Sequence, residues 1–559
     1  IQLSHLLAVD MGLNGDESIV IDIIWQSASP ITNGGIGSAI EKTFHVRIEK
    51  ERLASAVKRL IDAKKVFYSE DALVLAPSTI EEINKTLREN ENVEKEALDT
   101  WVLEFEKIIE ERCSANDQLN IRNAILSFIR EFFLAHGADC YSFVFGQKQN
   151  SFIDIDTVAA KHAKLDDDKN IPAFTAFLVS IFTLELTPAQ RAFLFTQLKK
   201  AISYLSMVID RRTRLTIMHQ LEGVTIYLDT SILYRLLNLQ GEKRYESISR
   251  LVQYCREANI AIKIFGVSIE EMKRRIDYDA RVIIEHPIPV NFASIGYRCR
   301  SSENYISTFW KAASETGVTP KDFNAKYSDI EGLLTSLGII LDTNNYVEEY
   351  ELEQVVSDVE GKIARFERPD FEYQKSPKAL NHDAQCLAII EKLQKPHAKT
   401  AIEGEILFLS SDRTLMKVQR YDYEYKNKAD IVVMPSQLLQ LFGMTSPTQD
   451  YLETFLGLFS SSRMYFGSNT LPNEKIQEII GRVAMFRGTT PAYAERVLTC
   501  QLIQASFEQK ETEEDKTSLI DDAMIIEVEA MELEIGEKGK ALELAQTESK
   551  NKKATIDTL

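Results

Sequence analysis

The residues with the clearest chemical meaning are acids that follow apolar segments. Asp229 comes directly after the β-branched, apolar run 224–228, and Asp412 follows the run 406–409 through two serines. A buried strand that ends at an acid places that acid at the carboxyl edge of its sheet, where open α/β sheets bind ligands. Glu271 and Asp383 lie near the starts of predicted helices. If the strands are neighbours in one sheet, these four carboxylates converge.

Convergence of acids has a chemical consequence. Like charges held close together are costly unless a cation neutralises them. Oxygen-only ligands favour Mg²⁺ or Mn²⁺. Such an ion lowers the pKa of a bound water and orients it toward a phosphodiester. The pattern therefore predicts a metal-dependent phosphodiesterase, with four acids as metal ligands and catalytic residues: Asp229, Glu271, Asp383 and Asp412.

Each of these acids also has an ordinary interpretation, because an acid after a strand often caps the next helix. The identity of the second acid is the least constrained by the sequence. We prefer Glu271 because an apolar residue follows it directly. The alternatives are Glu270, Asp277 and Asp279. His382, beside Asp383, is a candidate acid or base, although a polar residue near a helix start is the commoner explanation.

Polar and basic residues near the acids are candidate substrate contacts. Ser231 lies two residues after Asp229, so its hydroxyl is placed to bind a ligand. Lys273, Arg274 and Arg275 follow Glu271 and are candidate phosphate contacts. The ordinary interpretation of these three is a solvated helix surface.

The elements that would position these residues lie in 216–445, where short apolar strands alternate with helix patterns. The predicted strands are 224–228, 260–265, 406–409 and 431–434. This alternation is typical of a parallel α/β sheet. About a hundred residues, 278–378, interrupt it and are expected to form a mostly helical insertion.

The order of these motifs resembles the PIN-domain nucleases. In that family a strand ends in Asp with Ser or Thr two residues later, and a Glu at a helix start, a helix-borne Asp and a strand-end Ser/Thr-x-Asp follow; here these are Asp229 with Ser231, Glu271, Asp383, and Ser410 to Asp412. The resemblance covers 216–445 only, and the insertion departs from a minimal PIN domain. It implies a PIN-like α/β/α sandwich, products with 5′-phosphate and 3′-hydroxyl ends, and RNA in preference to DNA as substrate.

The flanking regions suggest regulation. Residues 1–90 show a helix–turn–helix–hairpin order that resembles a winged helix, 91–215 and 446–508 read as helical, and 509–559 form an acidic tail with a short heptad stripe. We therefore expect a homo-oligomer or a regulatory protein partner bound through these regions. The full prediction is a multidomain α/β protein with a central PIN-like domain.

Composition limits the function classes. A chain of 559 residues is too long for one core, and its net charge of −19 disfavours a protein that coats DNA nonspecifically. Six scattered cysteines without a C-x-x-C pair, the absence of a visible secretory signal and the absence of a long apolar run predict a cytoplasmic protein without a membrane span.

Other enzyme classes lack their motifs. The sequence has no P-loop G-x-x-x-x-G-K-S/T, no H-E-x-x-H and no G-x-S-x-G elbow. Two alternatives to an RNA-cleaving enzyme stay open. One is a DNA-cleaving effector of a bacterial antiviral or toxin system. The other is a nonenzymatic DNA-binding regulator or scaffold that uses the winged helix.

Overall fold

The computed structural model describes residues 15–145, 155–208, 216–367, 375–443, 449–459 and 471–485, with short gaps at 28, 45–46, 166–167, 183–184, 218 and 426–427, and the single residues 491, 495 and 498. The acidic tail 509–559 lies outside the described residues. The chain divides into two compact units, the first built from 1–237, 242–271 and 334–464 and the second from 238–241, 272–333 and 465–559. The protein is mixed α/β and mostly helical.

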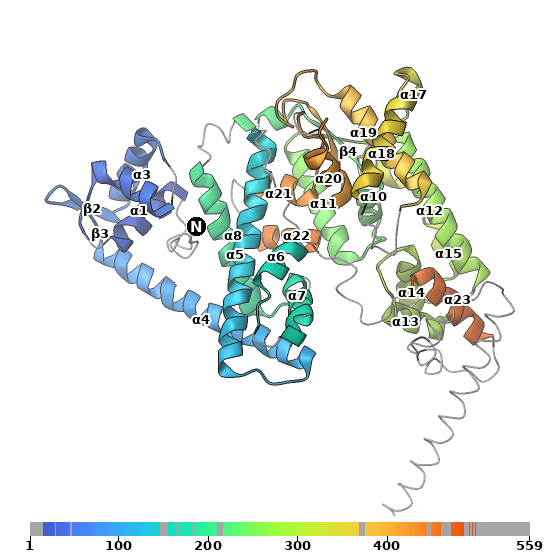
Figure 1. Cartoon of the computed structure of the whole chain (residues 1–559), viewed down its shortest axis with the longest axis horizontal. Helices are drawn as coiled ribbons and strands as arrows, with labels where there is room; N and C mark the ends of the chain where they lie inside the picture. Colours follow the sequence, from blue (N-terminus) through green and yellow to red (C-terminus); the bar gives the residue numbers. More distant parts are fainter. Residues whose placement is uncertain are drawn as a thin grey trace, which may run out of the picture. The chain divides into compact units, whose positions relative to one another are not determined.

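The N-terminal elements of the first unit are three helices and a small antiparallel sheet (Figure 1). They are α1 (Gly15–Gln26), β1 (Ile31–Thr32), α2 (Ile36–Phe44), α3 (Lys50–Asp62), β2 (Val66–Ser69) and β3 (Ala72–Leu75), with strand order β1-β3-β2. The hairpin turns at Glu70 and Asp71, whose φ angles of 53° and 66° suit the tight turns that match strand twist. The predicted helices and the hairpin are thus confirmed here.

Long helices follow, as the sequence predicts. They are α4 (Pro77–Ile109), α5 (Ala115–Phe145), α6 (Ile155–His162), α7 (Ile171–Ser180) and α8 (Pro188–Val208). Their aromatic residues form a core in which the rings of Phe132 and Phe182 stack at 4.5 Å and Trp101 meets Phe193 edge-on at 5.9 Å. These aromatic side chains therefore pack against one another in the interior of the helical region. Among the described residues, no helix combines the length and apolar character needed to cross a bilayer.

A five-stranded parallel sheet lies at the centre of the first unit. Its strands are β4 (Thr225–Leu228), β5 (Ala261–Phe265), β6 (Ile340–Asp342), β7 (Ile406–Leu409) and β8 (Val432–Val433), in the order β6-β5-β4-β7-β8. The four predicted strands are present. The interpretation of 278–378 as one helical insertion needs correction, because β6 lies inside it and pairs with β5. Three residues at a sheet edge are too short to show an alternating pattern.

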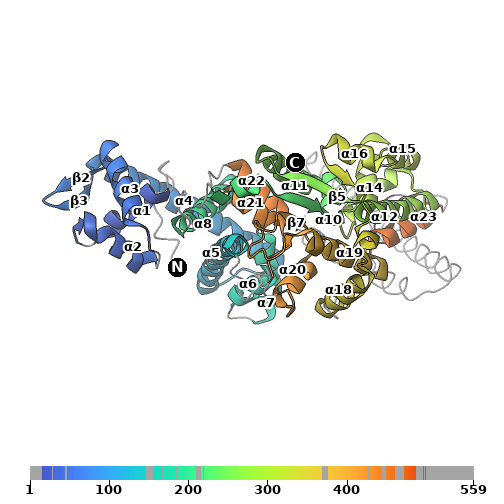
Figure 2. The ribbon, with the colours of Figure 1, turned by 90° about the horizontal axis from the view of Figure 1, so that it is seen from above.

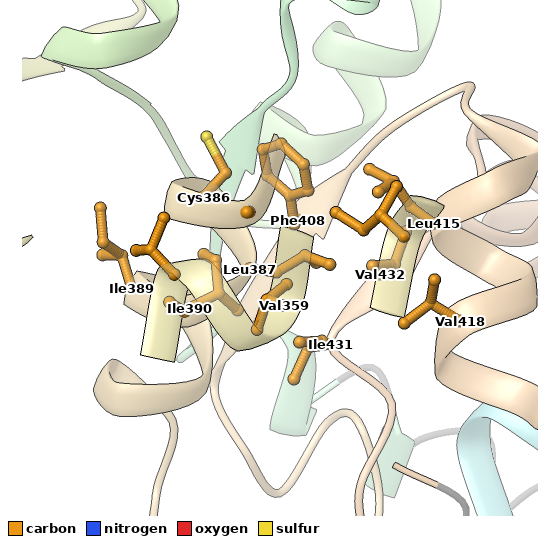
Figure 3. Close-up of a cluster of buried hydrophobic side chains, with 14 of the residues drawn as sticks. Val359, Cys386, Leu387, Ile389, Ile390, Phe408, Leu415, Val418, Ile431 and Val432 are labelled. Atoms are coloured by element: carbon orange, nitrogen blue, oxygen red, sulfur yellow. The ribbon is translucent and has the colours of Figure 1, made fainter. Parts of the chain in front are cut away.

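Helices cover both faces of this sheet. Tyr227, Phe408 and Val432 lie in register on one face and join a buried cluster with residues of α18 (Glu353–Phe366), α19 (Pro377–Leu393) and α20 (Arg413–Tyr421) (Figure 3). Because side chains alternate along a strand, Leu228 and Leu409 point to the other face. There α11 (Glu242–Glu257) packs on β5 and contacts α21 (Pro435–Gly443) and α22 (Gln449–Phe459), so α11 and α19 lie on opposite sides (Figure 2).

Three further helices follow strands of this sheet. Helix α10 (Thr230–Leu236) follows β4 directly, α17 (Tyr346–Glu349) follows β6, and α12 (Gly266–Glu285) begins at the end of β5, with only its residues up to Glu271 in this unit. Because β5 and β6 extend the sheet on one side of β4, and β7 and β8 on the other, the strand order reverses at β4. The carboxyl ends of β4 and β7 therefore border a topological switch point, where open α/β sheets bind ligands.

The second unit is helical among its described residues. It contains most of α12, together with α13 (Val290–Arg298), α14 (Tyr305–Thr316), α15 (Pro320–Ala325), the first part of α16 (Ile330–Ser336), and α23 (Asn473–Ala484). Helices α13 and α14 approach closely because Gly296 has no side chain: a Cβ there would lie 2.7 Å from the ring of Trp310. Trp310 in turn donates a hydrogen bond to Gln477 on α23.

Asp279, on α12 in this unit, is a buried acid whose ionisation should destabilise the fold, and this can be tested. Burial raises its pKa to about 7, opposed by Arg275, whose Nε lies 3.3 Å away, and assisted by Glu474. Since the folded state holds the proton more tightly than the unfolded state, stability falls as pH rises from about 4 to about 7. We expect Asp279→Asn to stabilise the unit at pH 8, by on the order of 2–4 kcal/mol, and to have little effect at pH 4.

Hydrogen exchange of α13 and α14 at the two pH values measures this effect. Arg275 keeps its ion pair with Glu474 at 2.5 Å in the variant, so no cation is stranded. Faster exchange in Asp279→Asn at pH 8 would contradict the assignment of an ionisation cost.

Candidate metal centre

Asp229 is the central acid of the site. It is the residue before α10, yet its side chain makes no capping hydrogen bond. Instead its Oδ2 accepts hydrogen bonds from the hydroxyls of Ser231 and Ser410, both at 2.6 Å. Its Oδ1 accepts no hydrogen bond from the described residues. The interpretation of Asp229 as an ordinary helix cap is therefore wrong.

The surroundings of Asp229 disfavour its charge. It is 5% exposed, and burial together with the nearby Asp383 carboxylate raises its pKa to about 6, although the serine hydroxyls and His382 act in the opposite direction. A buried carboxylate with one unbonded oxygen, facing a second carboxylate, is the arrangement that a divalent cation would relieve.

Asp383 lies on α19 and points toward Asp229. The helix begins at Pro377 with Ser376 as its N-cap, so Asp383 lies in the second turn. The sequence pattern suggests the first turn, which is wrong. Asp229, His382 and Asp383 each offer a ligand atom, and these atoms lie within 4.8 Å of one another. Two predicted ligands from distant parts of the chain thus meet.

Glu271 is held by two partners. Its Oε2 accepts a hydrogen bond from Thr230 at 2.6 Å and lies 2.8 Å from Nδ1 of His382. Helix α12 begins at Gly266, so Glu271 is inside the helix and does not open it. Of the alternative acids, Glu270 and Asp277 are exposed and Asp279 is buried in the second unit. The geometry therefore favours Glu271 as the second acid.

His382 connects Glu271 to Asp383. Its Nδ1 lies 2.8 Å from Glu271 and 3.1 Å from Asp383, while its Nε2 lies 2.9 Å from the Ser268 hydroxyl. Because ionised carboxylates only accept hydrogen bonds, Nδ1 carries a proton in this arrangement and does not bind a metal. Burial opposes the charged form, but Cys386, Asp383 and Glu271 outweigh it and raise the pKa of His382. His382 is only 3% exposed, so we interpret it as a residue that positions Glu271 and Asp383.

Asp412 combines two roles. As the N-cap of α20 it accepts a hydrogen bond from the backbone N–H of Thr414 at 2.7 Å through Oδ1. Its other oxygen, Oδ2, forms an ion pair with Lys375. The cap interpretation is therefore confirmed for Asp412, and its second oxygen contacts Lys375, which also contacts Asp383.

Lys375 is the residue that the sequence analysis missed. Its ammonium contacts Oδ2 of Asp383 and Oδ2 of Asp412. Burial lowers its pKa, but the two carboxylates raise it by more, so the net shift is upward. The residue lies two positions before α19 and belongs to no recognisable motif, so no sequence signal identifies it.

Of the predicted substrate contacts, the structure places Ser231 beside the acids and places the three basic residues in the second unit. The hydroxyl of Ser231 donates to Asp229 and accepts a hydrogen bond from the backbone of Ser411 at 3.3 Å, so in this structure it holds the site together. The three basic residues lie in the second unit: Lys273 pairs with Glu331 at 2.5 Å, Arg275 pairs with Asp279 and Glu474, and Arg274 is exposed.

The donor set fits a hard divalent cation. Asp229 and Asp383 supply carboxylate oxygens on facing elements, and Glu271 and Asp412 border them. Oxygen donors of this kind suit Mg²⁺ and Mn²⁺. A scan against protein-family models, a search of curated proteins and a search of solved structures each found no match for this chain. The function is therefore argued from the geometry of the site.

Proposed function

We propose that the chain is a metal-dependent endonuclease with a PIN-like domain that hydrolyses phosphodiester bonds, with RNA preferred to DNA. The observation that carries the proposal is the meeting of Asp229 and Asp383 at the switch point of the sheet, with Glu271 and Asp412 beside them. The order and type of these acids add the resemblance to PIN-domain nucleases.

Asp229 and Asp383 would hold the ion, and Mg²⁺ or Mn²⁺ bound there supplies an activated water and charge stabilisation at phosphorus. Ser231 and Ser410 fix the carboxylate plane of Asp229. Thr230 and His382 fix Glu271. In the hydrolysis, the water oxygen bonds to phosphorus, the P–O3′ bond breaks and a proton goes to O3′, which leaves 5′-phosphate and 3′-hydroxyl ends.

Glu271 and Glu270 provide a matched pair for testing the proposal, because the two residues are adjacent but only Glu271 contacts the site. We expect Glu271→Gln to lower the cleavage rate roughly 10- to 100-fold, the usual effect of losing a group that orients metal ligands. Glu270→Gln should cleave at the wild-type rate.

The assay follows a labelled single-stranded RNA and the DNA of the same sequence, with Mn²⁺, with Mg²⁺ and with EDTA. Cleavage that persists in EDTA, or equal rates for the two glutamine variants, would overturn the proposal. The ratio of RNA to DNA cleavage decides between the RNA-cleaving enzyme and the DNA-cleaving alternative.

A DNA-reading role for the N-terminal elements receives no support from α3. Arg52 pairs with Asp16 at 2.5 Å and Arg59 pairs with Glu17 at 2.6 Å, so two of its bases are engaged by acids of α1. Reading of DNA by a helix needs basic groups directed at phosphates. The nonenzymatic regulator is therefore the weaker proposal.

A further inference from the structure

Lys375 places a protein cation inside the cluster of acids. Its Nζ contacts Oδ2 of both Asp383 and Asp412, which come from α19 and from the loop that follows β7. The lysine side chain is 21% exposed, so the protein does not enclose it completely. The four-acid pattern does not require this contact.

Each carboxylate oxygen of these two acids already has one partner. Asp383 contacts His382 through Oδ1 and Lys375 through Oδ2. Asp412 accepts the Thr414 N–H through Oδ1 and contacts Lys375 through Oδ2. A divalent ion between Asp383 and Asp412 would have to displace the lysine. The side of the cluster toward Asp229 differs, because Oδ1 of Asp229 accepts no hydrogen bond from the described residues.

The ammonium also has a donor to spare. A lysine carries three N–H donors, and the partners of Lys375 within the described part of the chain are Asp383 and Asp412. The third N–H can donate to the oxygen of a phosphate that approaches the cluster. In two-metal nucleases a second ion gives this help, at about 4 Å from the first.

We propose that Lys375 takes the place of the second cation, so that the site binds a single divalent ion near Asp229 and Asp383 and the lysine donates to the scissile phosphate. This inference rests on the proposed nuclease function. A fixed ammonium is a strongly hydrated point charge that suits a phosphate oxygen. The Lys375 ammonium would therefore supply one of the two positive charges at the phosphate, whatever the metal concentration.

Metal counting tests the inference without reference to activity. Mn²⁺ alone is titrated into the full chain, the free ion is followed by its EPR signal, and the binding that remains in Asp383→Asn is subtracted because that acid borders both positions. We expect one Mn²⁺ per chain for the wild type and for the charge-keeping variant Lys375→Arg. We expect two for Lys375→Met, since the neutral side chain frees Asp412 and one side of Asp383.

Cleavage at saturating Mn²⁺ gives the second readout. Lys375→Met should be slowed at least tenfold, and Lys375→Arg should recover part of the rate. Lys378→Met should match the wild type because Lys378, three residues further on in the first turn of α19, is exposed. Comparable melting temperatures of the three variants show that the fold is kept.

The outcomes separate the two claims. Two Mn²⁺ ions in the wild type, or one ion and an unchanged rate in Lys375→Met, overturn the role of Lys375 and leave the nuclease proposal standing. No Mn²⁺ binding that depends on Asp383, together with no metal-dependent cleavage, overturns the nuclease proposal and the inference with it.

Discussion

Replacing Asp229 with asparagine is expected to abolish cleavage and, at the same time, to stabilise the metal-free protein. The amide keeps an oxygen that can accept from Ser231 and Ser410, so the local hydrogen bonds survive. What is lost is the charge that would hold the proposed ion. At about 1.4 kcal/mol per tenfold in rate, a ligand worth about 4 kcal/mol corresponds to a loss of roughly 10³-fold.

The gain in stability follows from the raised pKa of Asp229. Its folded pKa is about 6, against 3.8 for an ordinary aspartate, so the folded state binds the proton more tightly. Ionising this residue therefore destabilises the fold, and the cost develops as pH rises from about 4 to above 6. At pH 8 we expect Asp229→Asn to raise the free energy of unfolding by on the order of 2–3 kcal/mol.

Thermal unfolding in EDTA, with hydrogen exchange of β4 and β7, measures the difference at pH 4 and at pH 8. The low-pH comparison is the internal control, because the wild-type carboxyl is then largely protonated and the two proteins should agree. A variant that is less stable at pH 8, or that still cleaves, would show that Asp229 is a packing residue.

Asp383→Asn is expected to abolish cleavage equally but to change stability in the opposite direction. Asp383 contacts both His382 and Lys375, so neutralising it removes the carboxylate that these two side chains share. Breaking a buried ion pair by removing one partner costs about 3–5 kcal/mol. Since Asp412 still pairs with Lys375 and the amide keeps an acceptor, we expect a loss of about 2 kcal/mol.

The same unfolding experiment in EDTA at pH 7 measures this loss. Combining Asp383→Asn with Lys375→Met should restore part of the stability, because the double variant no longer strands the ammonium. If Asp383→Asn instead stabilises the protein, as Asp229→Asn is expected to do, then the contacts of Asp383 with His382 and Lys375 do not stabilise the fold in solution.

The positions of Asp229 and Asp412 could be predicted from the sequence because each ends a short apolar run, and parallel strands bring such ends to one edge. The convergence of Asp383 was harder to predict, since a residue on a helix reaches the edge only if the helix packs at the correct angle. The sequence pattern placed the start of its helix too close to Asp383, although Ser376 and Pro377 are a typical N-cap and first-turn proline.

Lys375 and β6 could not be predicted for different physical reasons. A lysine before a helix has no periodic or motif signal, and its contact with Asp412 depends on where α19 lies relative to β7. Strand β6 has three residues at the edge of the sheet, so local preference does not distinguish it from a loop. Both features are set by tertiary packing.

The pairing of β4 with β7 has a consequence for synthesis of the chain. The hydrogen bond from Ser410 to Asp229 joins residues that are 181 positions apart. At about 5–20 residues per second, a ribosome needs roughly 10–40 s between the two. During that interval Asp229 has been synthesised but Ser410 and Asp412 have not, so the chain has no complete centre. A ribonuclease built in this order would be inert toward the messenger and the ribosome while it is being made.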